Sequence, residues 1–263
     1  MNIEAIILNI TFCLKFNGGE TVKKLLTYEA WAEPTDEFVV DAQYKGALNV
    51  LNWSYEMYDE KLIYSCSFGI EGIVLIDLIS KVNPTAKIVF LDTGLHFPET
   101  YELIETIKQK YPLLRIEMIK PDLSVEEQAD QFGDELWKRQ PDRCCYMRKV
   151  LPLRKTLSKS TAWISGLRRE QSPTRRNTNF INKDETFQSI KICPLIHWSW
   201  KDIWKYVEDQ QLQYNPLHDQ GYPSIGCWPC TIQGDMETGS RSGRWVDQGK
   251  TECGLHLNKN DNQ

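Results

Sequence analysis

The stretch LIYSCSFGIEGIVLIDLISKV, residues 62–82, contains the pattern that decides the fold. Its first residues, LIYS, form a short apolar run that predicts a buried strand, and IVLIDLISKV predicts the helix that follows. Between them lies CSFGIEG, a segment of small residues that is typical of a loop. A strand that leads into a helix in this way is the first half of a unit with parallel strands.

The segments that follow repeat this alternation of strand and helix. Further strands are expected at residues 87–92, 114–119 and 161–167. Helices are expected at about 98–110, after Ser124, over 143–157, and after Ser199, which has capping-box spacing to Asp202. The pattern predicts an α/β fold with a mostly parallel, doubly wound sheet, whose ligands bind beyond the carboxyl ends of the strands.

Composition and charge narrow the class of protein. The 263 residues are 41% hydrophobic and 25% charged, which indicates one compact domain with a core of its own. A net charge of -5 offers no broad basic surface for nucleic acid, and no apolar run is long enough to span a membrane. The opening residues lack the features of a signal peptide. Eight cysteines without such a signal favour metal or redox chemistry in a cytoplasmic protein.

The loop after the first strand is a candidate anion site. It places Ser65, Ser67 and Gly69 at the start of a helix, where unpaired N–H groups and the positive end of the helix dipole attract phosphate. An ordinary strand-to-helix turn has a similar composition, so the loop alone leaves both interpretations open.

The second strand ends in FLDTGLHFPETYE, so Asp92, Thr93 and Gly94 are expected at the same edge of the sheet. Together the two segments resemble the modified P-loop and LDTG motifs of the assimilatory adenylyl-sulfate (APS) and phosphoadenylyl-sulfate (PAPS) reductases. This resemblance implies the adenine nucleotide α-hydrolase-like (PP-loop) fold and a sulfonucleotide substrate. The sequence departs from the Ser-Gly-Gly-x-Asp-Ser loop of ATP-cleaving proteins with this fold, which argues against ATP cleavage.

Four cysteines form two close pairs, Cys144 with Cys145 and Cys227 with Cys230. Thiolates ligate zinc or iron, and adjacent ligands suit a cluster of several irons better than one zinc ion. The alternative is that they are buried small hydrophobic residues. The pairs are similar to those that hold a 4Fe-4S cluster in one branch of the reductase family, which implies that these four are its ligands. The cysteines that match no ligand position are expected to be structural: Cys13, Cys66 and Cys193.

Basic residues follow the strand at 161–167. ISGLRREQSPTRR ends the strand near Gly166 and continues with Arg168 and Arg169. Arginine forks bind phosphate and sulfate oxygens, although a solvated loop is their commoner environment. The resemblance implies that Arg168 and Arg169 bind the substrate, with support from Gln171 and Ser172.

Three more basic residues acquire a role through the resemblance. Lys149 lies four residues after Cys145, on the same helical face, and is expected between cluster and substrate. Arg241 and Arg244 match the family's pair that closes on the substrate sulfate; otherwise they only make a tail more soluble.

The segment ECGLH contains Cys253 on a polar, glycine-bearing tail, where an exposed and mobile thiol would suit a nucleophile. It resembles the catalytic motif of the reductases. The resemblance implies that Cys253 attacks the sulfur of APS or PAPS and forms S-sulfocysteine, from which thioredoxin or glutaredoxin releases sulfite. His256 is either a base for this thiol or a surface residue.

The resemblance covers about residues 27–257 and divides the chain into three parts. These are an N-terminal extension at 1–26, a nucleotide- and cluster-binding domain at 27–235, and a flexible catalytic tail at 236–263. A homo-oligomer is expected by analogy alone. Two other functions remain possible, a PP-loop ATP-dependent ligase or sulfurtransferase and a zinc-stabilised nucleic-acid-binding module. The preference between APS and PAPS stays open.

Overall fold

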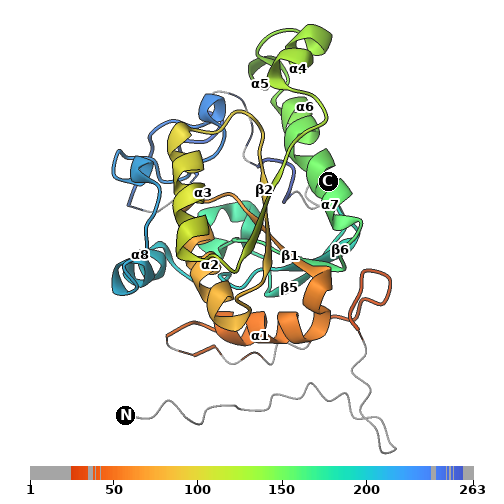
Figure 1. Ribbon diagram of the computed structural model, residues 1–263, viewed down its shortest axis with the longest axis vertical. Coiled ribbons are helices and arrows are strands. Elements are labelled where there is room, and N and C mark those ends of the chain that lie inside the picture. Colours follow the sequence, from red (N-terminus) through yellow and green to blue (C-terminus); the bar gives the residue numbers. More distant parts are fainter. Residues whose placement is uncertain are drawn as a thin grey trace, which may run out of the picture.

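A computed structural model describes residues 25–34, 38, 40–41, 43–237, 241–246, 248, 250 and 252–256. Nearly all of the expected N-terminal extension, including Cys13, therefore lies outside the described residues. Helices surround a central sheet (Figure 1). Within the described ranges, no helix has both the length and the apolar character needed to cross a bilayer.

The described strands form one sheet in the order β3-β2-β1-β4-β6-β5. Their bounds are β1 Leu62–Cys66, β2 Lys87–Leu91, β3 Arg115–Ile119, β4 Ala162–Ile164, β5 Ile181–Asp184 and β6 Ser189–Ile192. All neighbouring pairs are parallel except β5 with β6, which form an antiparallel hairpin. The mostly parallel α/β sheet is confirmed, whereas the hairpin was not predicted.

The helices agree with the expected positions and add two, one at the start of the domain and a short one at Leu136–Arg139. Their bounds are α1 Ala47–Tyr58, α2 Ile70–Val82, α3 Pro98–Lys110, α4 Val125–Phe132, α5 Leu136–Arg139, α6 Pro141–Cys145, α7 Leu151–Leu157 and α8 Trp200–Asp209. Ser124 and Ser199 begin α4 and α8 with complete capping boxes, as the sequence predicts for Ser199. A π-helical turn, η2 (Tyr146–Val150), joins α6 to α7 within the segment predicted as one helix.

Alternate residues of the central strands face two separate cores. Tyr64 of β1 and Phe90 of β2 pack with α1, α2, α3 and α8 on one face. Ile63 and Val89 face the other way and pack with α7 and with Leu255 from the C-terminal segment. Both faces are thus covered, as a parallel sheet requires.

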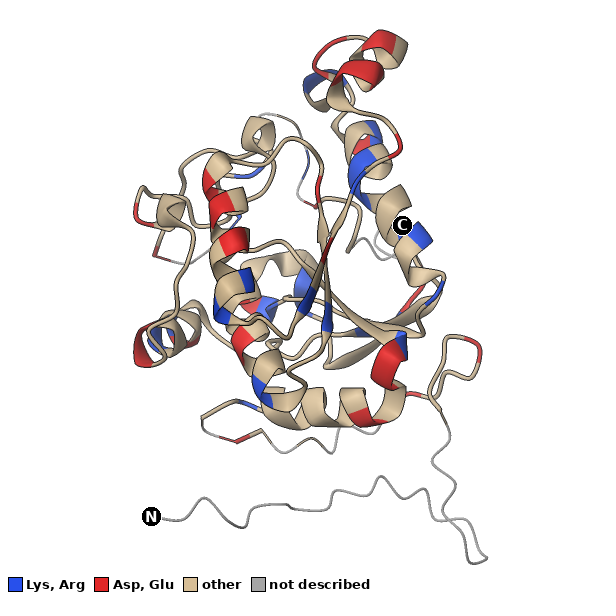
Figure 2. Ribbon diagram, viewed as in Figure 1, with Lys and Arg blue, Asp and Glu red and all other residues tan. Residues whose placement is uncertain are grey.

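Charged side chains are unevenly distributed over the helices. Acidic residues recur along α3, whereas the run from α6 to α7 carries mainly Lys and Arg (Figure 2). Helix α7 packs on one face of the sheet, and Lys149, which precedes it, lines the pocket of the candidate site.

Candidate active site

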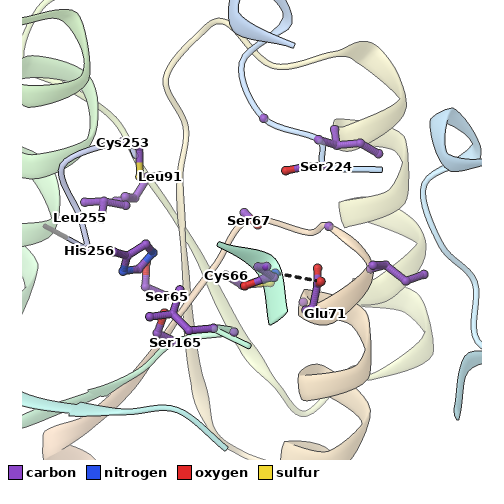
Figure 3. Close-up of a pocket in the computed structure, with 18 of the residues that line it drawn as sticks. Ser65, Cys66, Ser67, Glu71, Leu91, Ser165, Ser224, Cys253, Leu255 and His256 are labelled. Carbon is purple, nitrogen blue, oxygen red and sulfur yellow. Dashed lines mark hydrogen bonds between the residues drawn. The ribbon is translucent and has the colours of Figure 1, made fainter. Parts of the chain in front are cut away.

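A pocket opens at the carboxyl ends of β1, β2 and β4 (Figure 3). The segment with Cys253 and His256 lies across it from Glu71 near the start of α2. The sequence-predicted residues that line this pocket are Ser65, Ser67, Gly69, Lys149, Gly166, Gln171, Arg241, Arg244, Cys253 and His256. Residues from the whole length of the domain therefore meet in one place.

The loop between β1 and α2 makes an unusually sharp turn. Phe68 adopts a positive φ of 55°, which a residue other than glycine rarely takes, while its side chain is fully buried against Phe90. Such backbone strain is concentrated at functional sites. Gly69 then caps α2, so the free N–H groups of the first helical turn and the Ser67 side chain border the same pocket.

The LDTG turn follows the carboxyl end of β2, at the expected edge of the sheet, and its side chains contact protein groups. Asp92 Oδ1 accepts hydrogen bonds from Tyr101 Oη at 2.7 Å and from the Gly94 amide at 3.1 Å. Thr93 Oγ1 lies 3.3 Å from Cys227 Sγ. Asp92, Thr93 and Gly94 are not among the described residues that line the pocket. The turn therefore braces the cysteine loop, a role that the sequence did not suggest.

Carboxylates surround the guanidinium of Arg168. The side chain is fully buried, with Nε 2.9 Å from Glu71 Oε1 and Nη1 3.0 Å from Glu170 Oε2. Arg169 is directed to the Thr178 carbonyl at 2.8 Å and to Asn179. Neither arginine is among the described residues that line the pocket, and substrate contact by Arg168 and Arg169 stays a prediction. Protein acceptors occupy Nε and Nη1 of Arg168, whereas its buried Nη2 has no hydrogen-bond partner among the described residues.

The four predicted cysteine ligands line a second, smaller pocket beside the first. Cys144 and Cys145 come from α6, and Cys227 and Cys230 from the turn η6 (Trp228–Cys230) and the residue before it. All are at most 8% exposed, and none of the seven cysteines in the described ranges forms a disulfide. The two distant pairs are thus brought together as the sequence predicts.

Lys149 and Arg244 stand between the two pockets, since both residues line each of them. Burial acts to raise the pKa of Cys227, but the Lys149 ammonium, the Thr93 hydroxyl and Arg244 bring it below its ordinary value. The thiols Cys227, Cys145 and Cys253 in turn raise the pKa of Lys149, against the effect of burial. Lys149 is therefore a cation at neutral pH that lies close to the predicted cluster ligands and to Cys253.

The cysteine pocket has the chemistry of a site for a thiolate-bound cofactor. Burial raises the pKa of Cys144 to about 12 and of Cys230 to about 11, so stable thiolates there need a cation. Among the described residues, no three His, Cys, Asp or Glu side chains converge on a single metal-ion position. The four thiols instead share a pocket with the cations Lys149 and Arg244. Such a donor set fits iron or zinc.

Cys253 is buried, in contrast to the exposed and flexible tail expected from the sequence. Its exposed fraction is 8%, and it packs in the core on the second face of the sheet. The neighbouring His256 ring stacks on Trp163 with centroids 5.9 Å apart. Burial, followed by Lys191 and Arg175, lowers the pKa of His256, which is therefore neutral.

Several pocket residues were not identified from sequence. Arg175 lines the pocket, as does Gln171, for which the sequence predicts only a supporting role. His218 Nδ1 lies 2.7 Å from the Tyr222 carbonyl oxygen, which can only accept a hydrogen bond. Its Nε2 has no partner among the described residues. No local spacing signals these residues. Cys66 and Cys193 are buried, with pKa values raised by burial to about 12, and Cys66 also lines the pocket.

Comparisons with known proteins agree with this geometry. A family model for the phosphoadenosine phosphosulfate reductase domain matches residues 61–233. Adenosine 5'-phosphosulfate reductase 1 of Bacillus subtilis is 63% identical over 232 residues, which span 88% of this chain and 100% of that protein. The crystal structure of PAPS reductase from Candida auris, in its phosphate complex, has a TM-score of 0.62 at 33% identity, covering 71% of this chain and 90% of that one.

A more distant likeness concerns the fold alone. FMN adenylyltransferase from Candida glabrata has a TM-score of 0.52 at 19% identity, covering 78% of this chain and 68% of that chain. The matched family domain, together with the 63% identical relative that is covered over its whole length, shows that the chain belongs to the phosphoadenosine phosphosulfate reductase family.

Proposed function

We propose that the protein reduces adenosine 5'-phosphosulfate to sulfite and AMP with electrons from a dithiol protein. The observation that carries the proposal is the pocket that joins the β1–α2 loop, the cations Lys149, Arg175, Arg241 and Arg244, and the thiol of Cys253. The 63% identical relative is named as an APS reductase, which favours APS over PAPS as the substrate.

The first step is nucleophilic attack. The Cys253 thiolate forms a bond to the sulfonate sulfur, and the bond from sulfur to the phosphate oxygen breaks, so that AMP leaves with the electron pair. Lys149, Arg241 and Arg244, which line the pocket with Cys253, offset the negative charge that gathers on the sulfonate and the departing phosphate. The product on the protein is S-sulfocysteine.

The second step consumes two electrons from the external dithiol, for which thioredoxin or glutaredoxin is the proposed source. One thiolate of the dithiol attacks Cys253 Sγ and displaces sulfite, which gives a mixed disulfide. The second thiol of the dithiol then attacks its partner sulfur, and the Cys253 thiol is restored. No second cysteine of this chain is needed.

The nucleotide is proposed to lie along the loop after β1. Ser65, Ser67 and the first turn of α2 supply hydroxyl and N–H donors for the phosphate, and Gly166 allows the chain after β4 to approach the ligand closely. In this arrangement Arg168 acts indirectly, because its ion pair with Glu71 fixes the start of α2.

The cysteine pocket is proposed to hold a 4Fe-4S cluster. Cys144, Cys145, Cys227 and Cys230 would be its ligands, since four thiolates are the usual ligand set of such clusters. When bound, the cluster supplies a fixed negative charge and ties the α6 and η6 segments together beside Lys149. We retain the division into a domain at 27–235 and a catalytic tail from 236 onward.

The test is a sulfite assay on anaerobically purified full-length protein with thioredoxin, thioredoxin reductase and NADPH. APS should give sulfite, and the Cys253→Ser variant should bind AMP normally yet give none. Incubation of wild type with APS alone should leave an SO3 adduct on the tryptic peptide of residues 251–259. Release of pyrophosphate from ATP, without sulfite from APS, would instead support the PP-loop ligase.

A further inference from the structure

A buried ion pair anchors the residue that precedes Cys253. Glu252 and Arg175 are each 3% exposed. The guanidinium donates two hydrogen bonds to the carboxylate, from Nε to Oε1 and from Nη2 to Oε2, each at 2.9 Å. Arg241 Nη2 approaches the same carboxylate at 3.7 Å. This two-pronged geometry fixes orientation as well as distance.

A second buried anchor lies two residues beyond Cys253. Lys191 of β6 directs Nζ to the Leu255 carbonyl at 3.4 Å and to Asp184 Oδ2 of β5 at 3.0 Å. Trp163 Nε1 donates to the same Asp184 oxygen at 3.0 Å, and the Trp163 ring carries the stacked His256. The edge hairpin β5–β6 therefore holds the C-terminal segment against the sheet.

The two anchors leave little freedom to the residues between them. Gly254 adopts a φ of +79°, a conformation that side chains disfavour, and a Cβ there would lie 3.4 Å from Val150 Cγ2. The backbone therefore takes a left-handed conformation at the residue next to the thiol. Cys253 is directed into the pocket that contains Lys149, rather than into solvent.

We propose that Glu252 and Arg175, with Lys191 and Asp184 as a second anchor, are positioning residues that hold the Cys253 thiol at the pocket. This inference deepens the proposed function and rests on it. Burial acts to raise the pKa of Glu252, but Arg241 and Arg175 lower it overall, so the carboxylate stays charged at neutral pH. Loss of either partner leaves the other charge buried and uncompensated, which favours release of the segment.

The principal test measures how fast iodoacetamide alkylates Cys253 in the reduced full-length holoenzyme. Modification is read on the tryptic peptide of residues 251–259 by mass spectrometry. Glu252→Gln should accelerate alkylation at least ~10-fold and slow single-turnover formation of the SO3 adduct by a similar factor, because breaking a buried pair is costly. The Kd for AMP should stay within about twofold, because Glu252 itself does not line the pocket.

Two further variants separate release of the segment from a change in thiol acidity. Glu252→Gln removes a negative charge near the thiol and Arg175→Gln removes a positive one, so their direct effects on thiolate formation are opposite. Acceleration in both means that the segment is released. Glu252→Asp, which keeps the charge, should restore most of the slow wild-type alkylation.

The second anchor and the control complete the set. Exchanging Lys191→Met together with Asp184→Asn avoids a lone buried charge and should accelerate alkylation less than Glu252→Gln does. Asp209→Asn breaks an exposed ion pair with Lys205 on α8 and should leave alkylation unchanged.

The inference would be overturned if Glu252→Gln were alkylated, and formed the SO3 adduct, at the same rates as wild type. It would also be overturned if a loss of AMP binding accounted for slower adduct formation in this variant. The proposed function has a separate point of failure. If wild type forms no SO3 adduct with APS while alkylation still depends on Glu252, the anchors are real and the assigned reaction is wrong.

Discussion

The loop after β4 begins with Arg168 and Arg169, and the C-terminal segment contains Arg241 and Arg244, yet of these two pairs only the second lines the pocket. Arg168 is enclosed by Glu71 and Glu170, whereas Arg241 and Arg244 border a space with an excess of positive charge. The pocket lining includes the cations Lys149, Arg175, Arg241 and Arg244 but one carboxylate, Glu71, which is already paired. An anion site is thus identified by unbalanced charge, and the presence of arginine alone is insufficient.

The largest effect is expected from the C-terminal pair. Arg244→Ala should lower kcat/KM for APS by about 100-fold, because a cation aimed at developing charge is lost from a desolvated site. Arg244→Lys should recover part of this loss. The measurement is steady-state sulfite production at matched iron content. Near-normal activity of Arg244→Ala would contradict the assignment of the C-terminal arginine pair to the anion site.

Arg168→Ala should act on stability. Removing the guanidinium leaves Glu71 without its main partner, and we expect a loss of about 3 kcal/mol in the free energy of unfolding. Urea unfolding followed by circular dichroism measures this loss. Glu71→Gln combined with Arg168→Met, which removes both charges, should be milder. A fully stable Arg168→Ala variant with reduced APS affinity would return Arg168 to the role of a substrate ligand.

Acid should lower the stability that the buried carboxylates Glu71 and Glu252 contribute. Burial acts to raise the pKa of Glu71, but Arg168 brings it below the ordinary value of 4.5, and the pKa of Glu252 is lowered in the same manner. A carboxylate with a lowered folded-state pKa adds stability above pH 4.5 that is lost as the pH falls through the folded value. Stability between pH 3 and 6 should therefore decline less steeply in Glu71→Gln and in Glu252→Gln than in wild type. Identical slopes would contradict the assignment.

The smallest effect is expected at Arg169. Its fork contacts a carbonyl and an asparagine, so Arg169→Ala should cost about 1 kcal/mol of stability and leave kcat/KM within about twofold of wild type. Arg176→Ala is a matched control in the same loop. A large fall in kcat/KM for Arg169→Ala alone would show that this side chain reaches the substrate.

Local patterns in the sequence were sufficient for most of the parallel sheet. The segments that form β1, α2 and β2 are nearly continuous apolar runs, and α3 begins and ends where the sequence predicts, at Pro98 and Lys110. The β5–β6 hairpin was missed because its buried face contains Asp184 and Lys191, and charged residues ordinarily indicate exposed positions. Helix α1 was also missed.

Site residues in short sequence motifs could be predicted, whereas contacts between residues far apart in the sequence could not. The cysteine pairs and ECGLH were recognised from short motifs, and the structure brings their side chains to adjoining pockets. The ion pair of Arg168 joins residues 97 positions apart, and the contact between Thr93 and Cys227 spans 134 positions. A single sequence does not contain these partnerships, so the depth of Arg168 and the orientation of the LDTG turn could not be predicted.

The π-helical turn between α6 and α7 has a geometric consequence for how this protein tolerates change. Each residue of an α-helix advances the direction of its side chain by about 100°, and a π turn accommodates one residue more than a regular turn. Deleting one residue from Tyr146–Val150 would rotate α6 against α7 by that angle. Cys144 and Leu153 could then no longer both keep their present faces. The π turn therefore sets the angle between the face of α6 that carries Cys144 and the face of α7 that carries Leu153.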